Sequence, residues 1–282
     1  MTLLLTSTTL LATVHAVVSI IPQSTILHAI GGNKVDITLM VQAGDSPHSY
    51  EPKPSQMIAV SKADLYLAID VEFEHVWLPK FQSLNSKMLL VDITEDIQKM
   101  PMIHTHQTHS KYKTVDMHEH HSNDPHVWTS PSNIKIIAKN IYKALVKIDK
   151  KNEDYYQEHL DTFLSKVTKT DQIIQEILST HKEQHTFMVF HPSWGYFAKE
   201  YNLTQVAVEV EGKNPKPKAL VNLIKEAKEK KINAIFTQPE FSDASAKIIA
   251  KELHIPVVKI SPMAANWSEN LIFFAKTMAG KK

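Results

Sequence analysis

Short hydrophobic runs alternate along the chain with segments whose apolar residues recur at helical spacing. In the first half the runs lie at 17–21, 35–41, 65–69 and 88–91, with helix-like segments from Ser24 and Ser55. In the second half they lie at 186–190, 206–210, 232–236 and 257–260, with helix-like segments at 217–230, 243–253 and from 266. Strands that alternate with helices are typical of parallel sheets. The pattern predicts an α/β fold of two lobes, each with a central, mostly parallel sheet flanked by helices.

A long helix is predicted between the lobes. Neither glycine nor proline occurs from Ser132 to His191, and apolar residues keep helical spacing from 153 to 179. At about 1.5 Å per residue such a helix would run about 40 Å. We therefore expect a rigid backbone helix that joins the lobes and limits them to small tilting or local motions.

These patterns divide the chain into four segments. They are a signal peptide at 1–16, an N-terminal lobe at 17–150, a linker helix at 151–182 and a C-terminal lobe at 183–282. The leader is inferred from the apolar stretch at 3–21 and the small residue Ala16, although the first cationic residue is Lys34. We expect an exported, periplasmic protein with no membrane span in the mature chain.

A polar stretch interrupts the βα pattern between 92 and 124. Six of the chain's 16 histidines lie within its segment 104–121, at His104, His106, His109, His118, His120 and His121. Core packing does not explain such a tract, whereas the affinity of neutral imidazole for zinc, copper or nickel does. We expect an auxiliary, low-affinity metal-binding loop, and the alternatives are a solvated linker or a pH-responsive surface segment.

Three further histidines each stand in a short motif after an apolar run. The motifs are Ser46-Pro47-His48-Ser49-Tyr50-Glu51-Pro52, Asp124-Pro125-His126-Val127-Trp128 and His191-Pro192-Ser193-Trp194-Gly195-Tyr196-Phe197. His48 and His191 follow predicted strands, and open α/β sheets bind ligands at the carboxyl ends of their strands. Each histidine is next to proline and close to an aromatic residue, which would hold the imidazole and exclude water. The three are therefore candidate ligands of one buried metal.

Composition narrows the classes of ligand. The 282 residues carry a net charge of +1 from 31 cationic and 30 acidic residues, so nucleic acid is not an expected partner. Every cation is lysine, and without arginine a phosphate or amino-acid pocket is disfavoured. The absence of cysteine excludes disulfides, thiolate zinc sites and a lipid-modified cysteine anchor. Histidine and carboxylate remain as metal ligands.

The three motifs, in this order and spacing, resemble those of the metal-type solute-binding proteins of bacterial ABC importers, the ZnuA/TroA-like group. The resemblance covers nearly the whole mature chain and includes the long interdomain helix. It implies a non-enzymatic, monomeric protein that captures Zn²⁺ as its transported ligand and delivers it to an ABC permease in the inner membrane. In this family histidine at the position of His191 goes with zinc and glutamate with manganese, so manganese is less expected. Both lobes would then contribute ligands, His48 and His126 from the first and His191 from the second.

The fourth ligand is where the chain departs from the resemblance. Many relatives carry an acidic residue at the position that we match to Ser261, and serine is a poor zinc ligand. Glu240 or a water molecule is expected to complete the coordination, and a loop histidine or Glu51 are further alternatives. Glu209 is interpreted as a solvated loop residue or a docking feature rather than a ligand.

Other functions remain as alternatives at this stage. A three-histidine zinc hydrolase would need a general base, and the cluster His104-Thr105-His106-Gln107-Thr108-His109 has threonine where the metallo-β-lactamase type needs aspartate. A binding protein for an organic solute would share the two-lobed architecture, but the histidines and the missing arginine count against it. A periplasmic zinc storage or chaperone protein without a transporter is a further alternative, because the sequence does not identify a docking surface for a permease.

Overall fold

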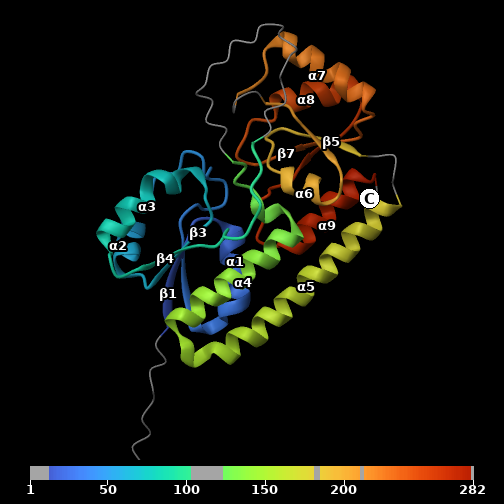
Figure 1. The fold of residues 1–282 in the computed structure, drawn as a ribbon. Coiled ribbons are helices and arrows are strands. Elements are labelled where there is room, and N and C mark those ends of the chain that lie inside the picture. The colour runs from blue at the N-terminus through green and yellow to red at the C-terminus, as the bar shows by residue number, and fades with distance from the viewer. Residues whose placement is uncertain (1–12, 103–122, 181–184, 210–212, 281–282) are drawn as a thin grey trace, which may run out of the picture.

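The N-terminal lobe is built on a four-stranded parallel sheet. The computed structural model describes residues 13–102, 123–180, 185–209 and 213–280 and places them in two lobes (Figure 1). The strands are β1 (Val14–Val18), β2 (Val35–Leu39), β3 (Leu65–Ala68) and β4 (Leu89–Asp92), in the order β2-β1-β3-β4. In their register Val14 pairs with Val35, and Leu65 pairs with both Ala16 and Leu89. The predicted βα alternation and parallel sheet are therefore confirmed for this lobe.

The boundary expected after Ala16 falls inside β1. This strand lies between β2 and β3 in the sheet, and all of its residues except His15 are buried. Cleavage after Ala16 would remove Val14–Ala16 from the middle of the sheet, so we propose that any leader ends before Val14. The predicted strand at 17–21 is also displaced, because residues 19–20 lead into a helix that begins at Ile21.

Within the described residues of this lobe, four helices accompany the sheet. They are α1 (Ile21–Gly31), α2 (Pro54–Lys62), α3 (Glu72–Leu84) and α4 (Pro131–Ile148), with short 3-10 turns at Gly32–Lys34, Val127–Thr129 and Lys150–Asn152. Ser130 caps α4, because its hydroxyl accepts a hydrogen bond from the Asn133 amide and Pro131 occupies the first helical position. Helix α3 was not predicted from the sequence; it contains Pro79 yet buries Phe73 and Phe81. Burial of its aromatic residues outweighs the hydrogen bond lost at proline.

The C-terminal lobe repeats the arrangement. Its sheet contains β5 (Thr186–Val189), β6 (Thr204–Ala207), β7 (Ile235–Thr237) and β8 (Val257–Lys259) in the order β6-β5-β7-β8, and every pairing is parallel. Its helices are α6 (Gly195–Glu200), α7 (Pro217–Glu229), α8 (Ala244–Leu253) and α9 (Trp267–Met278). The second predicted sheet is thus confirmed, with strand ends shifted by a few residues.

Helix α5 (Glu153–Ser179) has the bounds that periodicity predicted and runs along one side of both lobes (Figure 1). It packs against α1 and α4 of the first lobe and α9 of the second. Val167 and Ile174 are buried in this packing, and the Thr170 hydroxyl lies 2.6 Å from that of Ser268 on α9. The helix is therefore packed against both lobes.

The interface between the lobes is part of the hydrophobic core. One continuous cluster of buried residues includes β1 and β3 of the first lobe together with Trp128, Trp194 and Phe274, while a second cluster fills the outer part of the C-terminal lobe. Trp194 stacks on Phe274 with ring centroids 4.1 Å apart. Because packed interiors resist deformation, this shared core favours small motions between the lobes.

Candidate metal centre

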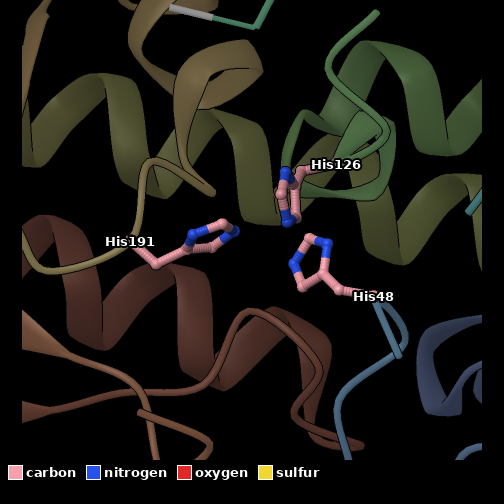
Figure 2. Close-up of side chains that lie close together, drawn as sticks. All are labelled: His48, His126 and His191. Carbon is pink, nitrogen blue, oxygen red and sulfur yellow. The ribbon is translucent and has the colours of Figure 1, made fainter. Parts of the chain in front are cut away.

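The structure brings His48, His126 and His191 together between the lobes. One ligand nitrogen from each imidazole can be chosen so that all three lie within 4.8 Å of one another. Figure 2 shows the three rings converging from different segments of the chain. The ring centroids of His191 lie 4.9 Å from those of His48 and 5.2 Å from those of His126. No other group of three histidine or carboxylate side chains within the described ranges meets the same criterion.

Each histidine is placed by a loop at one edge of its lobe. His191 follows the end of β5 directly, and His48 lies in the connection between β2 and α2, beyond the carboxyl end of β2. His126 immediately precedes the 3-10 turn that leads into α4. The sites after β2 and β5 are the positions at which parallel sheets commonly bind ligands, as the sequence predicted.

A carboxylate holds the Nδ1 atom of every one of the three rings. Glu72 Oε1 lies 2.8 Å from Nδ1 of His48, and Glu209 Oε1 lies 2.9 Å from Nδ1 of His191. Asp124 Oδ1 lies 2.7 Å from Nδ1 of His126. An Nδ1–H donated to a carboxylate leaves Nε2 unprotonated and directed away, which is the arrangement typical of metal-binding histidines.

Two of these carboxylates were not identified from the sequence. Glu209 was interpreted as a solvated loop residue, which is wrong, because it is only 5% exposed and pairs with His191. Glu72 was missed together with α3, where it is the first helical residue. Asp124 stands two residues before His126, so its spacing was visible, whereas nothing in the local sequence connects Glu72 with His48 or Glu209 with His191.

Buried atoms without partners mark the centre of the cluster. Nε2 of His191 is buried and has no hydrogen-bond partner in the described part of the chain, and the same is true of the second carboxylate oxygens of Glu72 and Glu209. Buried polar atoms normally have a partner. An unpaired imidazole nitrogen that faces two further histidines fits a metal ion as its partner.

The carboxylates also change the protonation of the cluster. Burial would lower the pKa of His48, but its hydrogen bond with Glu72 and the charges of Glu72, Glu209 and Asp124 raise it above 6.5. Burial alone would raise the pKa of Glu72, but the hydrogen bond and charge of His48 lower it to about 2. At His191 burial outweighs the hydrogen bond with Glu209, so the pKa of that imidazole is lowered. His191 is therefore neutral at neutral pH and free to bind a cation.

The pocket around the histidines contains Glu240 but only one of the aromatic residues that stand in the three motifs. Its lining includes Trp128, Phe241, Pro262, Met263 and Gln238. Phe241 stacks on His191 with centroids 4.7 Å apart and was not predicted. Trp194 packs on Phe274 and Tyr50 on Phe73, so these two aromatic residues support the loops instead of lining the pocket.

The fourth ligand remains a prediction. Glu240 lines the pocket but does not belong to the three-histidine group, and its Oε1 accepts a 3.4 Å hydrogen bond from Ser261. Burial raises the pKa of Glu240, which disfavours its charged form in the absence of a cation. His104, His106, His109, His118, His120 and His121 lie outside the described residues.

The arrangement matches a known family of metal-binding proteins. Residues 16–278 match the family described as "ZnuA: Zinc-uptake complex component A periplasmic". The chain belongs to the ZnuA family. A crystal structure of ZnuA shares 37% sequence identity with this chain and superimposes with a TM-score of 0.86, covering 95% of this chain and 99% of that one. The fold expected from the sequence is thereby confirmed.

Curated relatives include proteins named for different metals. The high-affinity zinc uptake system protein ZnuA of Bacillus subtilis is 28% identical over 243 residues, which cover 85% of this chain and 75% of that protein. A manganese ABC transporter lipoprotein, PsaA of Streptococcus pneumoniae, is 26% identical over 237 residues, covering 81% and 73%. The zinc-binding protein AdcA of Streptococcus pyogenes is 27% identical over 263 residues, 89% of this chain, and the chain spans half of AdcA's length.

Membership in the ZnuA family decides several of the expectations from the sequence. The family consists of non-catalytic, extracytoplasmic metal-binding proteins of ABC importers, so the zinc hydrolase and the organic-solute reading are both set aside. A permease partner is implied by the family. Within the described residues, no helix is both long enough and apolar enough to cross a membrane.

Proposed function

We propose that this ZnuA-family protein captures Zn²⁺ in the periplasm with His48, His126 and His191 and delivers it to an ABC permease. The observation that carries the proposal is the triad of imidazoles whose Nδ1 atoms are each held by a carboxylate. Nitrogen ligands in a compact site suit zinc, whereas manganese prefers carboxylate and water oxygen. Zn²⁺ is therefore the proposed cargo, and manganese is the weaker competitor.

The charges around the triad favour a cation. Three neutral imidazoles bring no charge, while Glu72, Asp124 and Glu209 place three carboxylates in contact with the rings. These carboxylates strengthen the imidazoles as donors and offset the charge of the ion. Water or Glu240 would complete a tetrahedral site.

The position of the triad between the lobes supports a role in transport. The ion would join residues of both lobes and stabilise the closed arrangement, because ligand binding stabilises the state that binds. We infer that the permease recognises this metal-loaded form of a monomer. A storage or chaperone role would use the same site without a permease, and metal uptake that depends on both this protein and a permease would separate the two.

The test is zinc titration of the metal-stripped protein. The variant combines His48→Ala, His126→Ala and His191→Ala, and the matched control combines His28→Ala, His75→Ala and His159→Ala, three described histidines outside the triad. We expect one tight event in the wild type and the control that is lost in the triad variant, with weaker events retained. Unchanged tight binding in the triad variant would contradict the proposal. Competition between zinc and manganese in the same titration tests the preferred metal.

A further inference from the structure

His126 belongs to the first half of the sequence, yet residues of the C-terminal lobe form hydrogen bonds with the segment on both sides of it. The Tyr196 hydroxyl on α6 donates a 2.9 Å hydrogen bond to the carbonyl of Asp124 and accepts a 3.1 Å hydrogen bond from the amide of Met100. On the other side of His126, Trp128 Nε1 donates to the carbonyl of Pro262 at 3.0 Å, and the Trp128 carbonyl accepts from Trp267 at 2.9 Å.

Tyr196 holds both strands of a short antiparallel stem. The stem consists of Met100 and Pro101 on one side and Asn123 and Asp124 on the other. Pro101 pairs with Asn123, and the Asp124 amide donates to the Met100 carbonyl at 2.7 Å. The Tyr196 side chain is 4% exposed, so its hydroxyl bonds to the stem in a buried setting where an unpaired polar group would be costly.

Asp124 transmits this constraint to the metal centre. Its carboxylate accepts from the backbone amide of His126 at 2.9 Å and lies 2.7 Å from Nδ1 of the same residue. Its backbone is held by Tyr196 and Met100 while its side chain holds the imidazole. A small displacement of Asp124 would therefore rotate or translate the His126 ring.

The segment that carries Tyr196 also carries His191. Gln238 accepts from the His191 amide and donates to the His191 carbonyl, while the Trp194 amide donates to Gln205. Gly195 lets this segment approach the stem, because a Cβ atom there would lie 2.7 Å from Asp124 Oδ2. The hydrogen bonds from Tyr196 to Asp124 and from Gln238 to His191 thus determine the distance between His126 and His191.

We propose that Tyr196 is a positioning residue for the metal centre, whose hydroxyl fixes Asp124 and thereby places His126 relative to His191. The inference rests on the proposed metal binding by the triad. It adds a function for a tyrosine whose described hydrogen bonds go to the backbone of Asp124 and Met100 and not to the three imidazoles. His126 and His191 form a preassembled pair because Tyr196 and Gln238 hold them to the same lobe.

The test compares Tyr196→Phe with Tyr201→Phe in the full chain. Tyr201 lies at the C-terminal end of the same helix, and its hydroxyl donates to Asp171 Oδ1 at 2.9 Å. Tyr201→Phe therefore also removes one tyrosine hydroxyl that donates to an aspartate. We expect Tyr196→Phe to weaken zinc binding about 10- to 100-fold, as losses of groups that orient metal ligands do, and Tyr201→Phe to change it less than about twofold. The visible spectrum of bound Co²⁺ should change in the first variant and not in the second.

Two further backgrounds separate positioning from general destabilisation. Added to His48→Ala, Tyr196→Phe should still reduce zinc affinity by about the same factor, whereas added to His126→Ala it should reduce it less than about twofold, since the group that it positions is gone. Equal losses in both backgrounds, or an unchanged affinity in Tyr196→Phe itself, would overturn the inference. Gly195→Ala, which pushes on Asp124 and keeps the hydroxyl, gives a second route to the same spectral change if Tyr196→Phe does not fold.

The two experiments distinguish failure of the inference about Tyr196 from failure of the proposed function. If the triad variant loses tight zinc binding while Tyr196→Phe retains it, only the inference about Tyr196 fails. If the triad variant retains tight binding, the proposed function fails and the inference fails with it.

Discussion

The loops of His48 and His126 come from the same half of the sequence but differ in how the fold holds them. The described bonds of the His48 loop lie within its own lobe, where Glu72 holds the ring and the Pro47 carbonyl accepts from Phe73. The His126 loop is bonded across the interface to Tyr196, Pro262 and Trp267. The His48 side chain is 28% exposed, whereas that of His126 is 4% exposed.

This difference changes the expected division of the metal site. His126 and His48 were expected to form the N-terminal contribution, with His191 alone from the other lobe. The structure instead bonds the loop of His126 to the lobe that carries His191, whereas the described bonds of the His48 loop stay within the first lobe. We therefore expect the ion to be held first by the buried pair and to be enclosed by the His48 loop.

The largest effect should come from removing a member of the buried pair. His126→Ala or His191→Ala should lower zinc affinity by more than about 100-fold, because loss of a ligand exceeds the effect of losing a group that only orients one. His48→Ala should cost less, because the more deeply buried pair of His126 and His191 stays intact. Competition with a zinc chelator of known affinity measures all three variants, and equal losses would contradict the grouping.

Removal of the carboxylates should have the next largest effect. Glu72→Gln, Asp124→Asn and Glu209→Gln should each weaken zinc binding about 10- to 100-fold. Glu72→Gln should also lower the pKa of His48, because burial lowers this pKa and the variant removes the charge of Glu72 that opposes it. Proton resonances of the His48 ring in the metal-free protein measure this shift, and a pKa that does not fall would exclude Glu72 as its cause.

The pH dependence should report mainly on His48. Its pKa is raised above 6.5, whereas that of His191 is lowered, so protons compete with the metal at His48 first as pH falls. Zinc affinity should decline as pH drops from above 6.5, and acidification should release the metal. In His48→Ala this first decline should be absent, while the decline at lower pH remains. A wild-type affinity that does not change between pH 7.5 and about 5.5 would be incompatible with imidazole ligation.

The smallest effect on metal binding is expected from substitution of Glu74, which lies with Glu72 in the first turn of α3. Its carboxylate is fully buried and accepts from the Ile69 and Asp70 amides, and burial raises its pKa to about 7. A pKa raised in the folded state contributes stability that is fully present below about 4.5 and is lost as pH rises through about 7. Glu74→Gln should remove this slope, worth about 3 kcal/mol across that window, and leave zinc affinity within about twofold. Urea unfolding of the metal-free protein at a series of pH values measures it.

Much of the fold could be predicted from the sequence, because apolar residues recur at regular spacing in its strands and helices. The bounds of α5 were predicted correctly because 27 residues without glycine or proline give a clear apolar stripe. Helix α3 was missed because Pro79 interrupts its pattern, and only its packing through Phe73 and Phe81 stabilises it. The start of β1 was displaced because an apolar strand and the apolar part of a leader have the same composition.

By itself, the sequence determined the two lobes, the linking helix and the three histidines that the structure brings together. Those features depend on local periodicity and on short motifs, and both can be recognised from residues that are close together in the sequence. Only the tertiary structure decided that Glu72 and Glu209 hold two of the rings, that Phe241 covers His191, and that Tyr196 bonds to Asp124. Each of these contacts joins residues that are far apart in the sequence, so it depends on how the helices and strands pack. Such contacts produce no periodic pattern in the sequence and could not be predicted from it.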